Sequence, residues 1–149
     1  NNINKEDVVL DLYCGVGTIS LHSAVNAKEV IGVEIVENAV LNAIKNKEIN
    51  GINNVEFLLQ DLSKGFILDK NFNTIIVDPP RNGIDKKTMD YILCKLPNKI
   101  IYMSCDANTL VRDLKILSDY YDIIKCNLYD MFSYTYHVES LCVLKIRKS

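Results

Sequence analysis

One cysteine stands at a position that favours a reactive thiolate. The apolar run KIIYMS (99–104) predicts a buried strand, and the stripe of Leu110, Leu114 and Leu117 predicts a helix beginning after Asp106. Cys105 therefore falls where a strand gives way to a helix, whose N-terminus carries a partial positive charge that favours an anion. Because the thiolate is the nucleophilic form of cysteine, Cys105 is a candidate nucleophile. The alternative is a small core residue, the usual role of a lone cysteine.

A segment near the C-terminus combines a carboxylate with aromatic rings. The sequence DMFSYTYHVES lies between two predicted strands and holds Phe132, Tyr134, Tyr136, His137 and Glu139. Aromatic side chains in such a segment are suited to stack on an unpaired base, as RNA-reading sites commonly require. The carboxylate is a candidate general base. The alternatives are that the rings cover the core and that the carboxylate is merely solvated.

The first predicted strand ends in a turn suited to a cofactor. In DLYCGVGTIS, Gly15 and Gly17 let the backbone turn sharply and approach a ligand that lies at the N-terminus of the next helix. Ser20 takes the place of the third glycine of the dinucleotide fingerprint. The GxG pattern alone is therefore a weak indication of a nucleotide-like ligand.

Acidic residues end or follow the neighbouring strands. Glu34 ends the second strand, where an acid bonds ribose hydroxyls in doubly wound folds; the alternative is an exposed strand-end carboxylate. Asp61 follows the third strand, where it suits either a bond from an adenine amino group or a helix cap. Asp78 begins DPPRNGID, and the two prolines give it a fixed direction toward the cleft at the strand ends. Arg81 in the same motif suits a phosphate contact or a solvated loop equally.

A parallel sheet would bring these residues together. Short apolar runs alternate with helical segments such as 37–50, which predicts one α/β domain over residues 1–149. We expect a seven-stranded, mainly parallel sheet with residues 8–13 central, helices on both faces, and an antiparallel last strand in an edge hairpin. The predicted strands are 8–13, 29–34, 55–59, 74–78, 99–104, 122–130 and 140–146.

Composition sets limits on the partners. The 149 residues carry a net charge of −2, so we expect no broad basic surface, and a nucleic-acid contact must be local or come from elsewhere. No apolar run approaches the roughly 20 residues of a membrane span, and the first residues, NNINKED, lack the charged start and apolar stretch expected of a signal peptide. The five cysteines show no CxxC spacing, which favours a reduced, cytoplasmic protein without a metal site. Cys94, Cys126 and Cys142 lie in apolar runs and are expected in the core. We expect a monomer.

Taken together, five segments resemble the RNA uracil-5-methyltransferases: DLYCGVGT, GVE, DPPR, YMSCDANTLVRDL and DMFSYTYHVES. The resemblance implies a Rossmann-like methyltransferase fold and S-adenosylmethionine as cofactor. It also implies methyl transfer to carbon 5 of a uridine in ribosomal RNA or tRNA through a covalent cysteine adduct. In this family pattern Cys105 matches the nucleophile and Glu139 the general base. The positions that match cofactor contacts, beside the glycine turn, are Tyr13, Thr18, Glu34, Asp61 and Asp78.

The chain also departs from that pattern. DMFS replaces the usual DMFP, and Tyr134 stands where a histidine is often found, so the path of the base-binding segment is open. Members of the family usually carry an N-terminal RNA-binding barrel and a central region, which implies that this chain is the catalytic domain of a longer protein.

Three other functions are compatible with parts of the sequence. An RNA cytosine-5-methyltransferase uses the same addition chemistry but usually has a second cysteine beside the prolines, and DPPR offers none. A nicotinamide-dependent oxidoreductase would share the glycine turn without explaining Cys105 and Glu139. A noncatalytic module that binds RNA or cofactor is the third.

Overall fold

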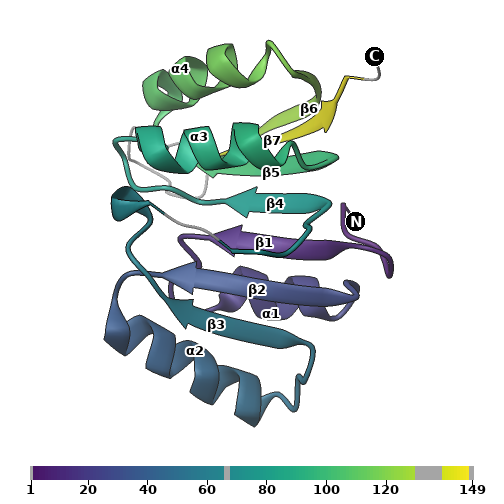
Figure 1. The fold of residues 1–149 in the computed structure, drawn as a ribbon, viewed down its shortest axis with the longest axis vertical. Helices are drawn as coiled ribbons and strands as arrows, with labels where there is room; N and C mark the ends of the chain where they lie inside the picture. The colour runs from purple at the N-terminus through teal and green to yellow at the C-terminus, as the bar shows by residue number, and fades with distance from the viewer. Residues whose placement is uncertain (1, 66–67, 130–138, 148–149) are drawn as a thin grey trace.

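The computed structural model describes residues 2–65, 68–129 and 139–147 (Figure 1). Their strands form one seven-stranded sheet in the order β3-β2-β1-β4-β5-β7-β6. The strands are β1 (Val8–Leu12), β2 (Glu29–Glu34), β3 (Val55–Leu59), β4 (Thr74–Val77), β5 (Lys99–Ser104), β6 (Tyr121–Tyr129) and β7 (Glu139–Ile146). The helices are α1 (Thr18–Ala24), α2 (Glu37–Ile49), α3 (Lys86–Lys95) and α4 (Ala107–Leu117), with a short 3₁₀ turn η1 (Leu62–Lys64).

The sheet confirms the predicted topology. β1 lies inside the sheet, paired in parallel with β2 and β4, and β5 continues the parallel part. β7 runs antiparallel to both β5 and β6. The predicted hairpin is therefore present, but the last strand lies inside the sheet and β6 forms the edge. The more apolar SLCVLKI takes the interior position, while β6 carries charged residues, which suit a sheet edge.

Successive side chains along each strand point to opposite faces of the sheet and pack into two core layers, one on each face. Leu10, Ile75 and Tyr102 pack with α3 and α4, whereas Val9 and Ile76 pack on the other side with α1 and α2. Figure 1 shows α3 in front of the sheet and α1 behind it. The carboxyl ends of the five parallel strands consequently meet at one edge. Among the described residues, no helix is long and apolar enough to cross a membrane.

Side-chain caps fix the starts of two helices at this edge. The Asp85 carboxylate accepts from the Thr88 backbone N–H at 3.0 Å and starts α3. The Asp106 carboxylate accepts from the Thr109 backbone N–H at 2.9 Å and starts α4, in agreement with the sequence. Cys105 therefore lies in the turn between β5 and α4, at the predicted junction.

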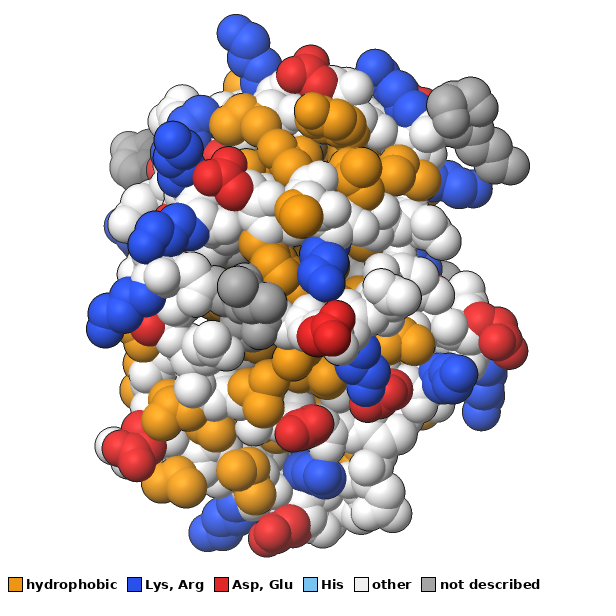
Figure 2. Space-filling view, viewed as in Figure 1, with side chains coloured by type: hydrophobic (Ala, Val, Ile, Leu, Met, Phe, Trp, Pro, Cys, Tyr) orange, Lys and Arg blue, Asp and Glu red, His pale blue; other side chains and the backbone are white. Residues whose placement is uncertain are grey.

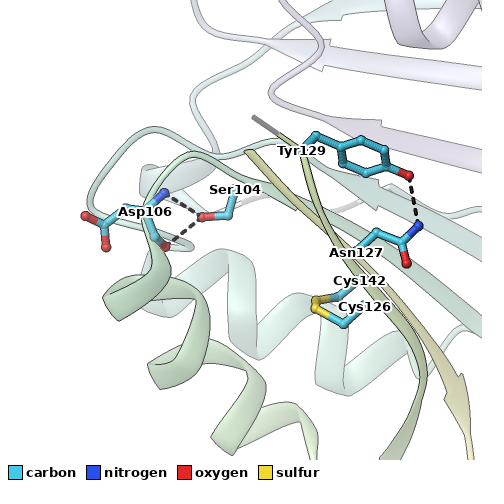
Figure 3. The surroundings of a disulfide bond; sticks show 6 residues. All are labelled: Ser104, Asp106, Cys126, Asn127, Tyr129 and Cys142. Carbon is cyan, nitrogen blue, oxygen red and sulfur yellow. Dashed lines mark hydrogen bonds between the residues drawn. A yellow bond between two sulfur atoms is a disulfide. The ribbon is translucent and has the colours of Figure 1, made fainter. Parts of the chain in front are cut away.

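The cysteines differ from the prediction in two respects. Cys142 is fully buried in β7, as expected, but Cys126 is exposed on β6, and the two face each other in register and form a disulfide (Figure 3). The expectation of a core position for Cys126 was wrong because β6 is the sheet edge. Cys94 is also exposed, in the last turn of α3. An apolar run alone does not reveal which of its faces is covered.

Candidate active site

Left-handed residues shape the turn between β1 and α1. Tyr13, Gly15 and Gly17 have φ angles of 64°, 55° and 81°. A Cβ atom on Gly17 would lie 2.6 Å from Cζ of Phe57, so this glycine allows α1 to pack closely against β3. A Cβ atom on Gly15 would meet nothing within 4 Å. The two predicted cofactor glycines thus differ: Gly17 serves the packing of the helix, and Gly15 borders open space.

Backbone amides hold the carboxylate of Glu34 in a fixed position. Its Oε2 atom accepts from the N–H of Gly15 at 2.9 Å, and Oε1 accepts from the N–H groups of Ile35 and Val36 at 2.8 and 3.0 Å. A carboxylate offers about four acceptor positions, so these three bonds leave capacity for a ligand hydroxyl group. Glu34 is therefore an anchored acid that links the glycine turn to the start of α2.

A cavity of about 250 Å³ opens beside this acid. Tyr13, Glu34 and Asp61 are among its polar lining residues, and Tyr13 donates from its hydroxyl group to Oδ2 of Asp85 at 3.0 Å. Three of the predicted cofactor residues therefore share one cavity. The apolar part of the wall comes from Val33, Ile35, Leu62 and Pro80.

Asp61 combines the two roles that the sequence left open. Its Oδ1 atom accepts from the backbone N–H of Ser63 at 3.0 Å and from the Ser63 hydroxyl at 2.6 Å, which caps η1. The Ser63 hydrogen bond, followed by the neighbouring Lys64, holds the pKa of this carboxyl group below its usual value. The same side chain lines the cavity, so the cap keeps an ionised acceptor in the cavity wall.

The other four predicted cofactor residues, Gly15, Gly17, Thr18 and Asp78, lie outside the cavity lining. Thr18 is the exposed first residue of α1 and borders a separate surface depression with His22 and Asn46. Asp78 follows β4 and lies within electrostatic reach of Glu139. Their contacts with a cofactor stay predictions.

Three strand ends bring Asp78, Cys105 and Glu139 together. β5 and β7 pair antiparallel as far as Ser104 and Ser140, so Cys105, which directly follows β5, and Glu139, which begins β7, each adjoin this last pair. Desolvation, followed by the negative charge of Glu139, raises the pKa of Asp78. The predicted nucleophile and base therefore occupy the same level of the sheet, next to a second carboxyl group.

The half-buried Cys105 lies in a turn with its own hydrogen bonds. The Ser104 hydroxyl donates to the carbonyl oxygen of Asp106 at 2.9 Å and accepts from the Asp106 N–H at 3.1 Å (Figure 3). These bonds span Cys105 and fix its backbone between strand and helix. The segment 130–138, with Phe132, Tyr134, Tyr136 and His137, lies outside the described residues.

Sequence reasoning gave no role to Asp11, which is fully buried in β1. Its Oδ2 atom accepts a hydrogen bond from the Ser20 hydroxyl, which explains the serine in the place of a third glycine. Its Oδ1 atom has no partner among the described residues. Burial raises the pKa of Asp11 to about 7 against the lowering effect of Ser20, and the Asp78 charge adds to the rise. The sequence offered one signal for a role of Asp11, namely an acidic residue inside an apolar run.

The chain is similar in sequence to known RNA methyltransferases. The profile of the tRNA (uracil-5-)-methyltransferase family matches residues 2–147. An RNA methyltransferase of Oceanobacillus iheyensis is 42% identical over 99% of this chain and 33% of its own length. The 23S rRNA (uracil(1939)-C(5))-methyltransferase of Marinomonas sp. is 40% identical over 99% of this chain and 34% of its own length. The chain thus spans about a third of these relatives.

A solved structure extends the similarity to three dimensions. The tRNA (uracil-54, C5)-methyltransferase of Pyrococcus abyssi, crystallised with S-adenosyl-L-homocysteine, superposes with a TM-score of 0.84 and 34% sequence identity. The match covers 95% of this chain and 35% of the archaeal protein.

Proposed function

Because the chain belongs to the tRNA (uracil-5-)-methyltransferase family, we propose that it is the catalytic domain of a longer RNA methyltransferase. The reaction is methyl transfer from S-adenosylmethionine to carbon 5 of a uridine in ribosomal RNA or tRNA. The observation that supports this proposal is the pairing of β5 and β7, whose last pair is Ser104 and Ser140, the chain neighbours of Cys105 and Glu139.

The cavity suits the chemistry of the cofactor. Val33, Leu62 and Pro80 offer apolar surface to an adenine ring, and Asp61 offers an acceptor to its amino group. Glu34 keeps an acceptor position for a ribose hydroxyl. The cofactor is positively charged at sulfur, so carboxyl groups around the strand ends favour its binding. When bound, S-adenosylmethionine supplies the methyl group.

In the proposed mechanism Cys105 starts the reaction and Glu139 ends it. The thiolate forms a bond to carbon 6 of uracil, and the electrons of the 5,6 double bond move toward the carbonyl oxygen at carbon 4. Carbon 5 thereby becomes nucleophilic enough to take a methyl group. Glu139 then removes the proton from carbon 5, the double bond re-forms, and the bond from carbon 6 to sulfur breaks to release Cys105.

RNA binding by this region depends on local contacts. On the face shown in Figure 2, positive and negative side chains of the described residues are interspersed, without a broad basic area. Phosphate contacts dominate affinity for nucleic acid, so most of the electrostatic attraction to RNA should come from the rest of the longer protein.

The proposed reaction is testable on cellular RNA. Mass mapping of ribosomal RNA and tRNA from cells that lack the full-length gene should reveal the loss of 5-methyluridine at a defined position. The purified full-length protein with S-adenosylmethionine should restore it. Unchanged 5-methyluridine would contradict the proposal, and loss of 5-methylcytidine instead would identify a cytosine-5-methyltransferase. Cofactor binding without methylation of any RNA would indicate a noncatalytic module.

Replacing Glu34 by alanine in the full-length protein should weaken cofactor binding. Loss of a hydrogen bond to a charged group costs on the order of 1.5–3 kcal/mol, or roughly ten- to a hundredfold in affinity. Calorimetry measures the dissociation constant, and thermal unfolding shows whether the turn around Gly15 survives. Glu37→Ala is the matched control. Glu37 is an exposed acid in the first turn of α2, near Glu34 in the chain but outside the cavity lining. Equal affinities of the Glu34 and Glu37 variants would refute the assignment.

A further inference from the structure

A buried carboxylate on α4 binds the loop that follows β4. Asp113 is 1% exposed, and its Oδ2 atom accepts from the backbone N–H of Ile84 at 2.9 Å and from the Tyr102 hydroxyl at 2.6 Å. Its Oδ1 atom accepts from Nε of Arg112 at 2.8 Å. A buried charge is stable only when it is paired and hydrogen-bonded, and these three donors meet that requirement.

Arg112 binds the same loop through its carbonyl groups. Its Nη2 atom donates to the carbonyl oxygen of Asn82 at 2.9 Å and to that of Ile84 at 3.3 Å. Together, Arg112 and Asp113 therefore bind both donors and acceptors of the loop backbone. Only a planar guanidinium group can make these bonds while remaining paired with the carboxylate.

The loop is shaped to accept this contact. Gly83 has a φ angle of 75°, and a Cβ atom there would lie 2.5 Å from Nη2 of Arg112 and 2.6 Å from Oδ2 of Asp113. The absence of a side chain at residue 83 thus lets α4 approach the loop backbone.

The contact joins the two parts of the proposed active site. The loop begins at Asp78, and its Pro80, Asn82 and Gly83 form one wall of the cofactor cavity. The other partner of the contact lies next to Cys105. Tyr102 is on β5, which ends just before Cys105, and α4 begins two residues after Cys105.

We infer that Arg112 and Asp113 are positioning residues that fix the distance between the bound cofactor and the uridine attached to Cys105. This inference rests on the proposed function. Neither residue needs to touch a substrate, since both act through the loop and the start of α4. A misplacement of about 1 Å between reacting groups can lower a rate about a hundredfold.

The test measures the methylation rate separately from cofactor binding. In the full-length protein, Arg112→Gln should lower the single-turnover methylation rate about 10- to 100-fold. The affinity for S-adenosyl-L-homocysteine should change less than about threefold, since the anchored Glu34 and Asp61 remain. Arg112→Lys should be as slow as Arg112→Gln, because an ammonium group keeps the charge but cannot make the forked contacts. Tyr102→Phe, which removes one bond to Asp113, should shift the rate in the same direction.

Arg147→Gln is the control. Arg147 is as exposed as Arg112, and the substitution breaks its ion pair with the exposed Asp122 on β6. The methylation rate of this variant should stay within twofold of the wild type. A wild-type rate for Arg112→Gln would overturn the inference, as would a slow rate explained by lost cofactor affinity. Full activity of Arg112→Lys would instead identify a charge contact with RNA and overturn it too. A wild-type protein that methylates no uridine would refute the proposed function itself, before any variant is compared.

Discussion

Cys105→Ala in the full-length protein is expected to abolish the covalent RNA adduct and to lower methylation at least about a thousandfold. Uracil is too poor a nucleophile at carbon 5 without prior addition at carbon 6, so loss of the thiolate removes the reaction path rather than slowing one step. The adduct is visible as a band of lowered mobility on a denaturing gel, and methylation is followed by transfer of a labelled methyl group. The expectation has a physical basis independent of family membership, because Cys105 lies beside the N-terminus of α4.

The chain offers a matched control for this variant. Cys94 is also a free cysteine and is more exposed than Cys105, but it lies in the last turn of α3. Cys94→Ala should form the adduct and methylate RNA like the wild type. If Cys105→Ala methylated uridine at the wild-type rate, covalent catalysis by this residue would be excluded.

Glu139→Gln should fail at a later stage than Cys105→Ala. The amide cannot take the proton from carbon 5, so the variant should add to the base and methylate it once, then accumulate a methylated adduct. General-base catalysis contributes typically 10²–10⁴-fold, and turnover should fall by about that factor. A denaturing gel with labelled methyl groups distinguishes this outcome from the empty lane expected for Cys105→Ala. Normal turnover without trapped adduct would show that Glu139 is not the base.

Two carboxyl variants complete this experiment. Asp78 is electrostatically coupled to Glu139, so Asp78→Asn tests whether the neighbouring acid performs the proton transfer instead. A methylated adduct in Asp78→Asn, and not in Glu139→Gln, would exchange the two roles. Glu56→Gln, an exposed acid on β3 at the far edge of the sheet, should turn over normally.

Local sequence determined most of the elements. The alternation of apolar runs and helical stripes predicted all seven strands and the helices after β2 and β5, because burial of every second or every third to fourth residue is a property of neighbouring residues. The same local chemistry offered Asp106 or Asn108 as the cap of α4, and the structure has Asp106. The position of Cys105 between strand and helix was therefore readable before any tertiary contact was known.

Other features depend on segments that are far apart in the chain. The insertion of β7 between β5 and β6 decides that the start of β7, with Glu139, lies beside the end of β5 and that Cys126 is exposed. The order of the strands in the sheet cannot be read from local periodicity, because all strands compete for the buried positions.

The polar network around the loop after β4 is the clearest case. The sequence showed an acid at position 113 between Leu110 and Leu117, on the stripe that faces the core, but not its partners. Those are Tyr102 on β5 and the backbone of a loop about thirty residues away, which approaches because Gly83 has no side chain. A buried charge is tolerated only where such donors converge, and the convergence exists only after the sheet and α4 have packed together. The sequence alone thus determined which groups could react, whereas tertiary packing decided which of them meet.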